Sequence, residues 1–123
     1  MKLNRKEVYD KYDGRCAYCG EKIEYKDMQI DHLVPLSSRG KFKLVNPNDI
    51  SNLMPSCRVC NNWKSNYRLE DFRKSLEDQI NILKRNSSNF RMACKYNLIK
   101  AVKDVSITFY FEYVEIMGDL DET

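Results

Sequence analysis

The segments Cys16-Ala17-Tyr18-Cys19-Gly20 and Cys57-Arg58-Val59-Cys60 repeat one short motif, two cysteines separated by two residues. Each such turn places two thiolates about one edge of a metal tetrahedron apart, so the two turns together offer the four sulfur ligands of a closed structural zinc site. Gly20 suits the tight turn after the first pair because glycine readily adopts positive φ. We therefore predict that these four cysteines bind one structural zinc ion.

Two other interpretations of the cysteines stay open. One is a thiol redox motif, although the strand and helix context of thioredoxin-like proteins is missing. The other is a set of four unrelated buried thiols. A disulfide framework is not expected in a reducing compartment. The fifth cysteine, Cys94, stands alone and is expected to be a small buried residue on a helix.

The composition limits the class of protein. A chain of 123 residues, 42% hydrophobic and 32% charged, is expected to form one globular domain. The longest apolar run, residues 107–111 if one threonine is allowed, is far shorter than the roughly 20 residues of a membrane span. No apolar stretch follows the charged N-terminus, so we expect a cytoplasmic protein without a membrane partner. The net charge of +3 permits a polyanionic partner without requiring one.

The 37 residues between the cysteine pairs are too many for a plain zinc ribbon, so further structure must lie inside the zinc bracket. This insert contains the single histidine of the chain, His32, directly after Asp31. A strand-like stretch ends at these two residues, and a return strand is expected near Leu53 and Met54. A lone histidine is usually an ordinary surface or core residue, but a carboxylate neighbour at the end of a strand favours a catalytic one.

This arrangement resembles the HNH endonucleases, which contain a ββα-metal finger. The matching residues follow the family order and are Cys16-x2-Cys19-Gly20, Ile30-Asp31-His32-Leu33-Val34-Pro35-Leu36, Ser51-Asn52-Leu53-Met54-Pro55-Ser56-Cys57-x2-Cys60-Asn61 and Lys64. The chain departs from the family at Asn61, where many members have histidine, and in the basic, irregular loop of residues 37–49. The C-terminal end also resembles small stand-alone HNH proteins of bacteria and phages.

The resemblance implies a metal-dependent endonuclease that hydrolyses phosphodiester bonds of DNA. His32 would be the general base, since an imidazole can take a proton from water at cellular pH. Asp31 and Asn61 offer hard oxygen ligands for a catalytic Mg²⁺ or Mn²⁺ ion, which would bridge the scissile phosphate. Asn52 is expected by analogy to hydrogen-bond across the loop and hold His32 in position.

Four basic residues are candidate contacts with the DNA backbone. Lys64 follows Asn61 by one helical turn and is predicted either to reach a phosphate or to be an ordinary exposed lysine. Arg39, Lys41 and Lys43 interleave with apolar residues in the loop after His32.

The alternative function is a non-catalytic, zinc-stabilised nucleic-acid-binding adaptor or regulator. The presence of Asp31, His32, Asn52 and Asn61 together argues against it, because a domain without activity has no need of that set. DNA rather than RNA is the expected substrate. The protein is expected to act as a monomer or a homodimer.

The predicted fold class is α+β, a single compact domain with two parts. Residues 1–66 are expected to hold the ββα-metal finger and its zinc, and residues 67–123 an extension packed on that core. The N-terminal part should begin with a short helix capped at Asn4, which stands at capping-box spacing from Glu7.

The extension is predicted from its periodicity. Apolar residues at helical spacing predict a helix over residues 69–85 and a short one over 90–96, and alternation over 105–114 predicts a terminal strand. We expect this part to support the core; a DNA-contacting or dimerising role is the alternative. The basic residues behind that alternative are Arg68, Arg73, Lys74, Lys84, Arg85 and Arg91, with acidic residues interleaved among them.

Overall fold

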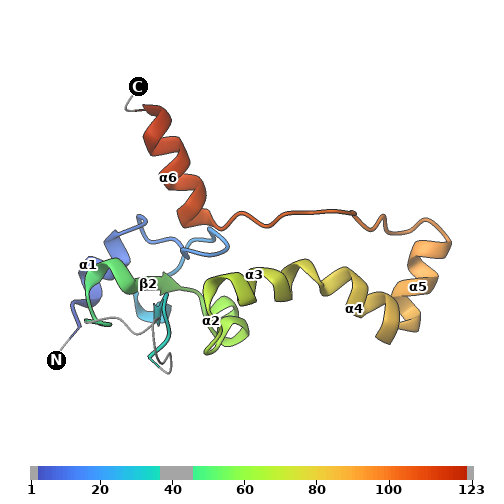
Figure 1. Cartoon of the computed structure of the whole chain (residues 1–123), viewed down its shortest axis with the longest axis horizontal. Coiled ribbons are helices and arrows are strands. Elements are labelled where there is room, and N and C mark those ends of the chain that lie inside the picture. Colours follow the sequence, from blue (N-terminus) through green and yellow to red (C-terminus); the bar gives the residue numbers. More distant parts are fainter. Residues whose placement is uncertain (1–2, 37–45, 122–123) are drawn as a thin grey trace. The chain divides into compact units, whose positions relative to one another are not determined.

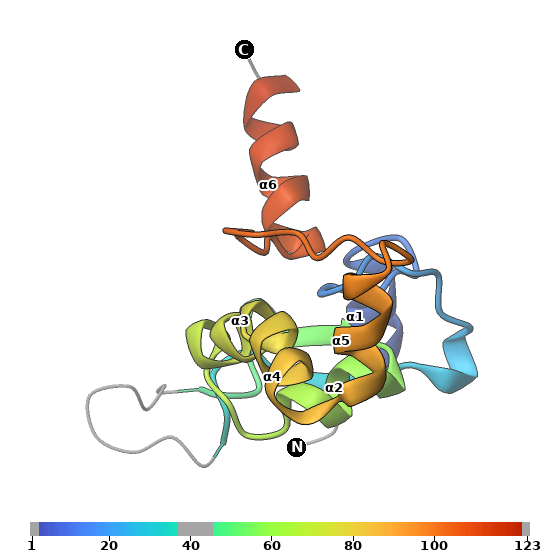
Figure 2. The ribbon, with the colours of Figure 1, turned by 90° about the vertical axis from the view of Figure 1, so that its right-hand side faces the viewer.

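The computed structural model describes residues 3–36 and 46–121, and its elements are traced in Figure 1 and Figure 2. The chain forms two compact units, one from residues 1–69 and 108–123 and one from residues 70–107. The expected division at residue 66 is close to the first boundary, but the C-terminal segment belongs with the first unit. Within the described ranges, no helix has the length and apolar character needed to cross a bilayer.

The first unit is built on a two-stranded antiparallel sheet. Strand β1 (Gln29–His32) pairs with β2 (Leu53–Ser56), so that Asp31 lies opposite Met54. Helix α1 (Arg5–Asp10) packs on β2, and α2 (Arg58–Lys64) packs on β1. The predicted hairpin and the helix opened by the second cysteine pair are therefore present, and the α+β class is confirmed.

Polar side chains fix the two ends of α1. The side chain of Asn4 accepts a hydrogen bond from the N–H of Glu7 at 3.1 Å, which confirms the predicted cap. At the other end, the Lys11 ammonium donates to the carbonyl oxygens of Ile50 at 2.7 Å and Leu53 at 2.8 Å. Lys11 therefore ties α1 to the start of β2 through the 3-10 turn η3 (Ile50–Asn52).

The second unit is a run of short helices: α3 (Leu69–Glu77), α4 (Gln79–Asn86) and α5 (Ser88–Lys95). The predicted helix over residues 69–85 is thus interrupted at Asp78, whose ψ of −7° departs from helical geometry although hydrogen bonds run through it. The short helix predicted over 90–96 corresponds to α5 and is confirmed. Helices α4 and α5 pack against each other (Figure 1, Figure 2).

The predicted strand over residues 105–114 is wrong, because residues 110–121 form helix α6 (Tyr110–Asp121). The N–H groups of Tyr110 and Phe111 have no partner inside the helix, and they donate to the carbonyls of Tyr18 at 3.1 Å and Ala17 at 2.8 Å. The Glu112 carboxylate accepts from the Phe109 N–H at 2.9 Å, as in a capping box.

The alternating apolar pattern has a different physical cause. Phe109 and Phe111 are both buried, and their rings pack on the edge of Tyr18 at centroid distances of 5.6 and 6.2 Å. Two aromatic residues on either side of a helix start thus fill one site in the core. A strand pattern and a helix start with two aromatic anchors look alike in the sequence.

Replacing Phe109 by alanine should lower the free energy of unfolding by about 3–5 kcal/mol, because its ring is 1% exposed and leaves a cavity. The matched control is Tyr113→Ala, at a residue one turn further along whose side chain is 54% exposed. This substitution should change the free energy of unfolding by no more than about 0.5 kcal/mol. Urea denaturation of both variants measures the difference. Equal losses would show that this segment is not anchored by Phe109.

Candidate active site

Four cysteine sulfur atoms meet between the two turns of the repeated motif. The Sγ atoms of Cys16, Cys19, Cys57 and Cys60 all lie within 4.8 Å of one another. The Cys19 and Cys57 sulfur atoms are 3.9 Å apart, which matches the edge of about 3.8 Å in a tetrahedron with ordinary zinc–sulfur bonds. The cluster can therefore hold a metal ion such as zinc.

The backbone around these sulfurs forms the predicted turns. Gly20 has a φ of +81°, and its N–H donates to the Cys16 carbonyl at 3.0 Å. Cys57 caps α2, and its sulfur accepts from the N–H of Cys60 at 3.4 Å. The N–H of Ala17 donates to Pro55 of β2 at 2.8 Å, so the first turn is fastened to the sheet as well.

The charges of the cluster also fit a cation. A hydrogen bond from Cys60 lowers the pKa of Cys16 to about 4, whereas the pKa of Cys60 is raised, chiefly by that same bond. Burial raises the pKa of Cys19 to about 12. Without a cation, the low pKa of Cys16 thus stands beside the raised pKa values of Cys19 and Cys60. A divalent metal ion is what allows several neighbouring thiols to ionise together.

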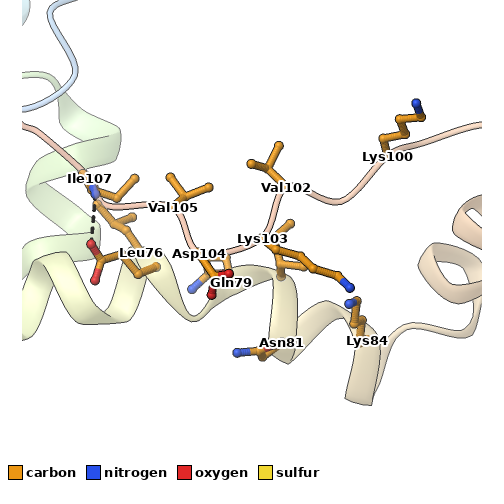
Figure 3. Close-up of a pocket in the computed structure, with 12 residues that line it drawn as sticks. Leu76, Gln79, Asn81, Lys84, Lys100, Val102, Lys103, Asp104, Val105 and Ile107 are labelled. Atoms are coloured by element: carbon orange, nitrogen blue, oxygen red, sulfur yellow. Dashed lines mark hydrogen bonds between the residues drawn. The ribbon is translucent and has the colours of Figure 1, made fainter.

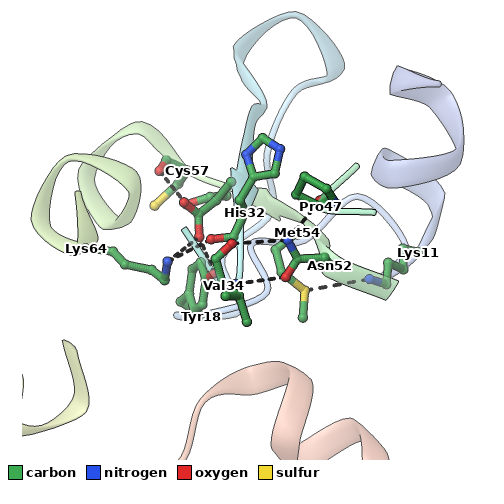
Figure 4. A network of polar contacts seen from close by, with 11 residues as sticks. Lys11, Tyr18, His32, Val34, Pro47, Asn52, Met54, Cys57 and Lys64 are labelled. Atoms are coloured by element: carbon green, nitrogen blue, oxygen red, sulfur yellow. Dashed lines mark hydrogen bonds and ion pairs between the residues drawn. The ribbon is translucent and has the colours of Figure 1, made fainter. Parts of the chain in front are cut away.

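Asp31 lies on β1 with its carboxylate almost fully buried, at 7% exposure. Its Oδ2 accepts a hydrogen bond from the Tyr18 hydroxyl at 2.5 Å and lies 3.0 Å from the Lys64 ammonium (Figure 4). Burial, and after it the charge of Asp31, holds the pKa of Tyr18 well above its ordinary value, so the phenol stays a donor. Both partners thus engage one oxygen of the carboxylate.

Lys64 lies in the core and not on the surface, where the sequence analysis expected it. It is fully buried, and its ammonium also donates to the His32 carbonyl at 3.0 Å. Both predicted roles, a phosphate contact and an exposed lysine, are therefore wrong. The reason is the buried carboxylate: a charge out of water needs a partner, and Lys64 is on the face of α2 that packs on β1.

His32 ends β1, and its imidazole points away from Tyr18 and Lys64 (Figure 4). Its Nε2 lies 2.7 Å from the Asn48 Oδ1. An amide oxygen can only accept a hydrogen bond, so Nε2 is the donor in this contact. Nδ1 is then the nitrogen that is able to accept a proton.

Asn52 fastens the two ends of the segment that follows His32. Its amide nitrogen donates to the carbonyls of Val34 at 3.2 Å and Pro47 at 2.9 Å, and its Oδ1 accepts from the Val34 N–H at 2.8 Å. Asn52 thus bridges the loop as expected, but the contact with the imidazole comes from Asn48.

Asp31 and His32 share an open pocket of about 110 Å³, which Pro35, Ser65 and Asn66 also line. Asn61 lies on α2, one turn before Lys64, and so is on the helical face that Lys64 directs at β1. The candidate DNA contacts Arg39, Lys41 and Lys43 lie outside the described residues.

Sequence reasoning missed two residues of the site. Tyr18 stands inside the first cysteine pair, where spacing drew attention to the sulfurs and not to the residue between them. Asn48 is one of several asparagines in a loop, and no periodicity marks it. Both are recognised only once the strand end and the two loops are close in space.

Comparisons with known proteins agree with the geometry. Residues 16–67 match the family model described as HNH endonuclease. The chain is 33% identical over 64 residues to the CRISPR-associated endonuclease Cas9 of Corynebacterium diphtheriae, covering 52% of this chain and 5% of that protein. These findings confirm the resemblance inferred from the motifs.

Two further matches were found. Over 74 residues the chain is 32% identical to the SPbeta prophage-derived protein YoqL of Bacillus subtilis, whose name assigns it to the HNH endonucleases; the match covers 54% of this chain and 30% of that one. The crystal structure of the Type II-C Cas9 enzyme from Actinomyces naeslundii matches with a TM-score of 0.47 and 33% identity, over 57% of this chain and 7% of that one. The chain thus spans less than a third of each relative.

Removing one ligand of the cysteine cluster should unfold the first unit, because metal binding and folding are coupled in small domains of this type. Cys19→Ser is expected to lose bound metal and to give poorly soluble protein. Cys94→Ser, outside the cluster, is the matched control and should keep both metal and fold. Elemental analysis with circular dichroism reads out both variants, and a folded Cys19→Ser protein would contradict the expectation.

Removing the two partners of Asp31 should lower the free energy of unfolding by different amounts. Lys64→Met leaves a buried carboxylate without its counter-charge and should cost about 3–5 kcal/mol in unfolding free energy. Tyr18→Phe removes one hydrogen bond to a charged group and should cost about 1.5–3 kcal/mol. Chemical denaturation of each variant, and of each combined with Asp31→Asn, measures the coupling. Additive losses would show that Asp31 does not link the two.

Proposed function

We propose that the HNH endonuclease domain formed by residues 16–67 hydrolyses phosphodiester bonds of DNA, with His32 as the general base. The observation that carries the proposal is the geometry at the end of β1. There, an imidazole with Nε2 engaged by Asn48 stands next to the buried carboxylate of Asp31, and both border one open pocket.

His32 has the arrangement that a base requires. The Asn48 contact fixes the ring in the form that leaves Nδ1 able to take a proton from water. Lys64 holds the His32 carbonyl, and Asn52 holds the chain two residues later at Val34. The ring is thus oriented by its own contact with Asn48 and by the backbone that follows it.

Asp31 and Asn61 would hold the catalytic Mg²⁺ or Mn²⁺ ion. The donor set fits, because such ions prefer oxygen ligands and keep several waters beside one or two protein groups. When bound, the ion would neutralise charge on the phosphate and on the departing oxygen. Tyr18 and Lys64 both engage Oδ2, so their part is to hold the carboxylate in one orientation.

Zinc in the cysteine cluster would have a structural role. The four sulfurs leave no open coordination position, which is the mark of a structural and not a catalytic site. The cluster joins the first turn to the start of α2, and α2 carries both Asn61 and Lys64. A zinc ion there would set the distance between β1 and the residues that act with it.

DNA is the substrate that the charge and the relatives favour. Residues 1–66 hold 12 basic and 8 acidic residues, which suits a polyanion. Two of the matched proteins are CRISPR-associated endonucleases, although the chain covers only 5% and 4% of their lengths.

The test is cleavage of supercoiled plasmid by the purified protein with and without Mg²⁺. We expect conversion to nicked or linear DNA only with the ion. His32→Ala should slow cleavage by about 10²–10⁴-fold, the usual contribution of a general base. The matched control is Gln29→Ala at the exposed start of the same strand, which should cut normally.

Two outcomes would overturn the proposal. Cleavage by His32→Ala within a few fold of wild type would show that another group takes the proton. A wild-type protein that binds DNA and keeps its zinc but does not cut with Mg²⁺ or Mn²⁺ would favour the non-catalytic adaptor.

A further inference from the structure

Residues 79–103 carry basic residues and no acidic one. The six basic residues, all exposed, are Lys84, Arg85, Arg91, Lys95, Lys100 and Lys103. The pattern changes on both sides, since α3 mixes the two signs and residues 104–121 carry only acidic charges. We call the side chains of these six residues the basic surface.

The fold gathers half of this surface at one corner. Helices α4 and α5 pack against each other, and Ser87 between them caps α5 by accepting from the N–H of Phe90 at 3.1 Å. The Arg91 guanidinium donates to the carbonyls of Lys84 at 2.7 Å and Arg85 at 3.1 Å. The Arg91 side chain is thereby held against the end of α4 that carries Lys84 and Arg85.

Three lysines of the basic surface border a cleft of about 530 Å³ between the α3–α4 run and residues 100–107 (Figure 3). Lys84, Lys100 and Lys103 line it, and Figure 3 shows Lys84 and Lys103 extending toward the same end. The Glu77 carboxylate, also in the lining, already accepts the N–H of Ile107 at 2.9 Å. None of the six cations forms an ion pair within the described part of the chain.

A structural explanation covers only part of the pattern. Cations in the last turn of a helix interact favourably with its dipole, which accounts for Lys84, Arg85 and Lys95. It does not account for Lys100 and Lys103, which follow α5 outside any helix. Gathered like charges repel, and α3 shows that this chain elsewhere places acids among its cations.

We propose that the basic surface binds the phosphate backbone of duplex DNA, as a second binding surface besides the nuclease site. This rests on the proposed function. Cations spread over two helices and a following segment suit a partner with regularly repeated negative charge rather than one small anion. Lysines dominate the set, and they bind phosphates without reading bases, so binding should be independent of sequence.

The test compares two variants with the same change in net charge. K84Q/K95Q/K100Q/K103Q neutralises the basic surface while leaving Arg91 and its helix contacts in place. K6Q/K22Q/K26Q/K74Q neutralises four exposed lysines that stand near acidic residues. Both are made in the full chain with His32→Ala to block cleavage, and fluorescence anisotropy with two unrelated 20-base-pair duplexes is recorded from low to high NaCl.

The first variant should bind both duplexes at least roughly tenfold more weakly at low salt. Its slope of log affinity against log salt should become shallower by about one for each phosphate that the protein no longer neutralises. The control should keep most of the wild-type affinity and slope. Equal DNA affinities and equal salt slopes of the two variants would overturn the proposal. It would also be overturned if the first variant lost binding to anionic phospholipid vesicles while its DNA binding stayed unchanged. Because cleavage is not measured, failure here is distinct from failure of the plasmid test.

Discussion

Four sulfur atoms brought within 4.8 Å of one another from two distant turns are the constraint on which the first unit depends. Their approach closes the chain around the hairpin, and a closed loop loses much less entropy when the rest of it folds. The first turn is hydrogen-bonded to two other elements. Its Ala17 N–H donates to the Pro55 carbonyl of β2, and the carbonyls of Ala17 and Tyr18 accept from the first N–H groups of α6. One short turn thus joins the sheet, α2 and the C-terminal helix.

Much of this arrangement can be predicted from local sequence, and the failures have a common cause. Cysteine spacing, the Asn4 cap and the His32 strand end are local signals, and each led to the observed structure. Lys64 and the terminal strand were misjudged because their states are decided by distant partners, the buried Asp31 and the Tyr18 ring. Which charge is buried depends on tertiary packing and not on spacing.

The buried pair of Asp31 and Lys64 has a meaning beyond stability. A carboxylate out of water needs a compensating charge nearby, and the Lys64 ammonium supplies it at 3.0 Å. The Tyr18 hydroxyl donates a hydrogen bond to the same oxygen and so helps to orient the carboxylate. The first unit therefore carries a buried carboxylate whose charge is already compensated inside the protein.

The clamp at Asn52 has a consequence for how such a domain can diversify. By holding Val34 and Pro47, it isolates the hairpin from whatever chain runs between those two points. Lengthening a connection whose ends are pinned costs little free energy, since the closure entropy grows only slowly with length. Changes of length between Val34 and Pro47 should therefore leave the end of β1 and the Asn52 hydrogen bonds as they are.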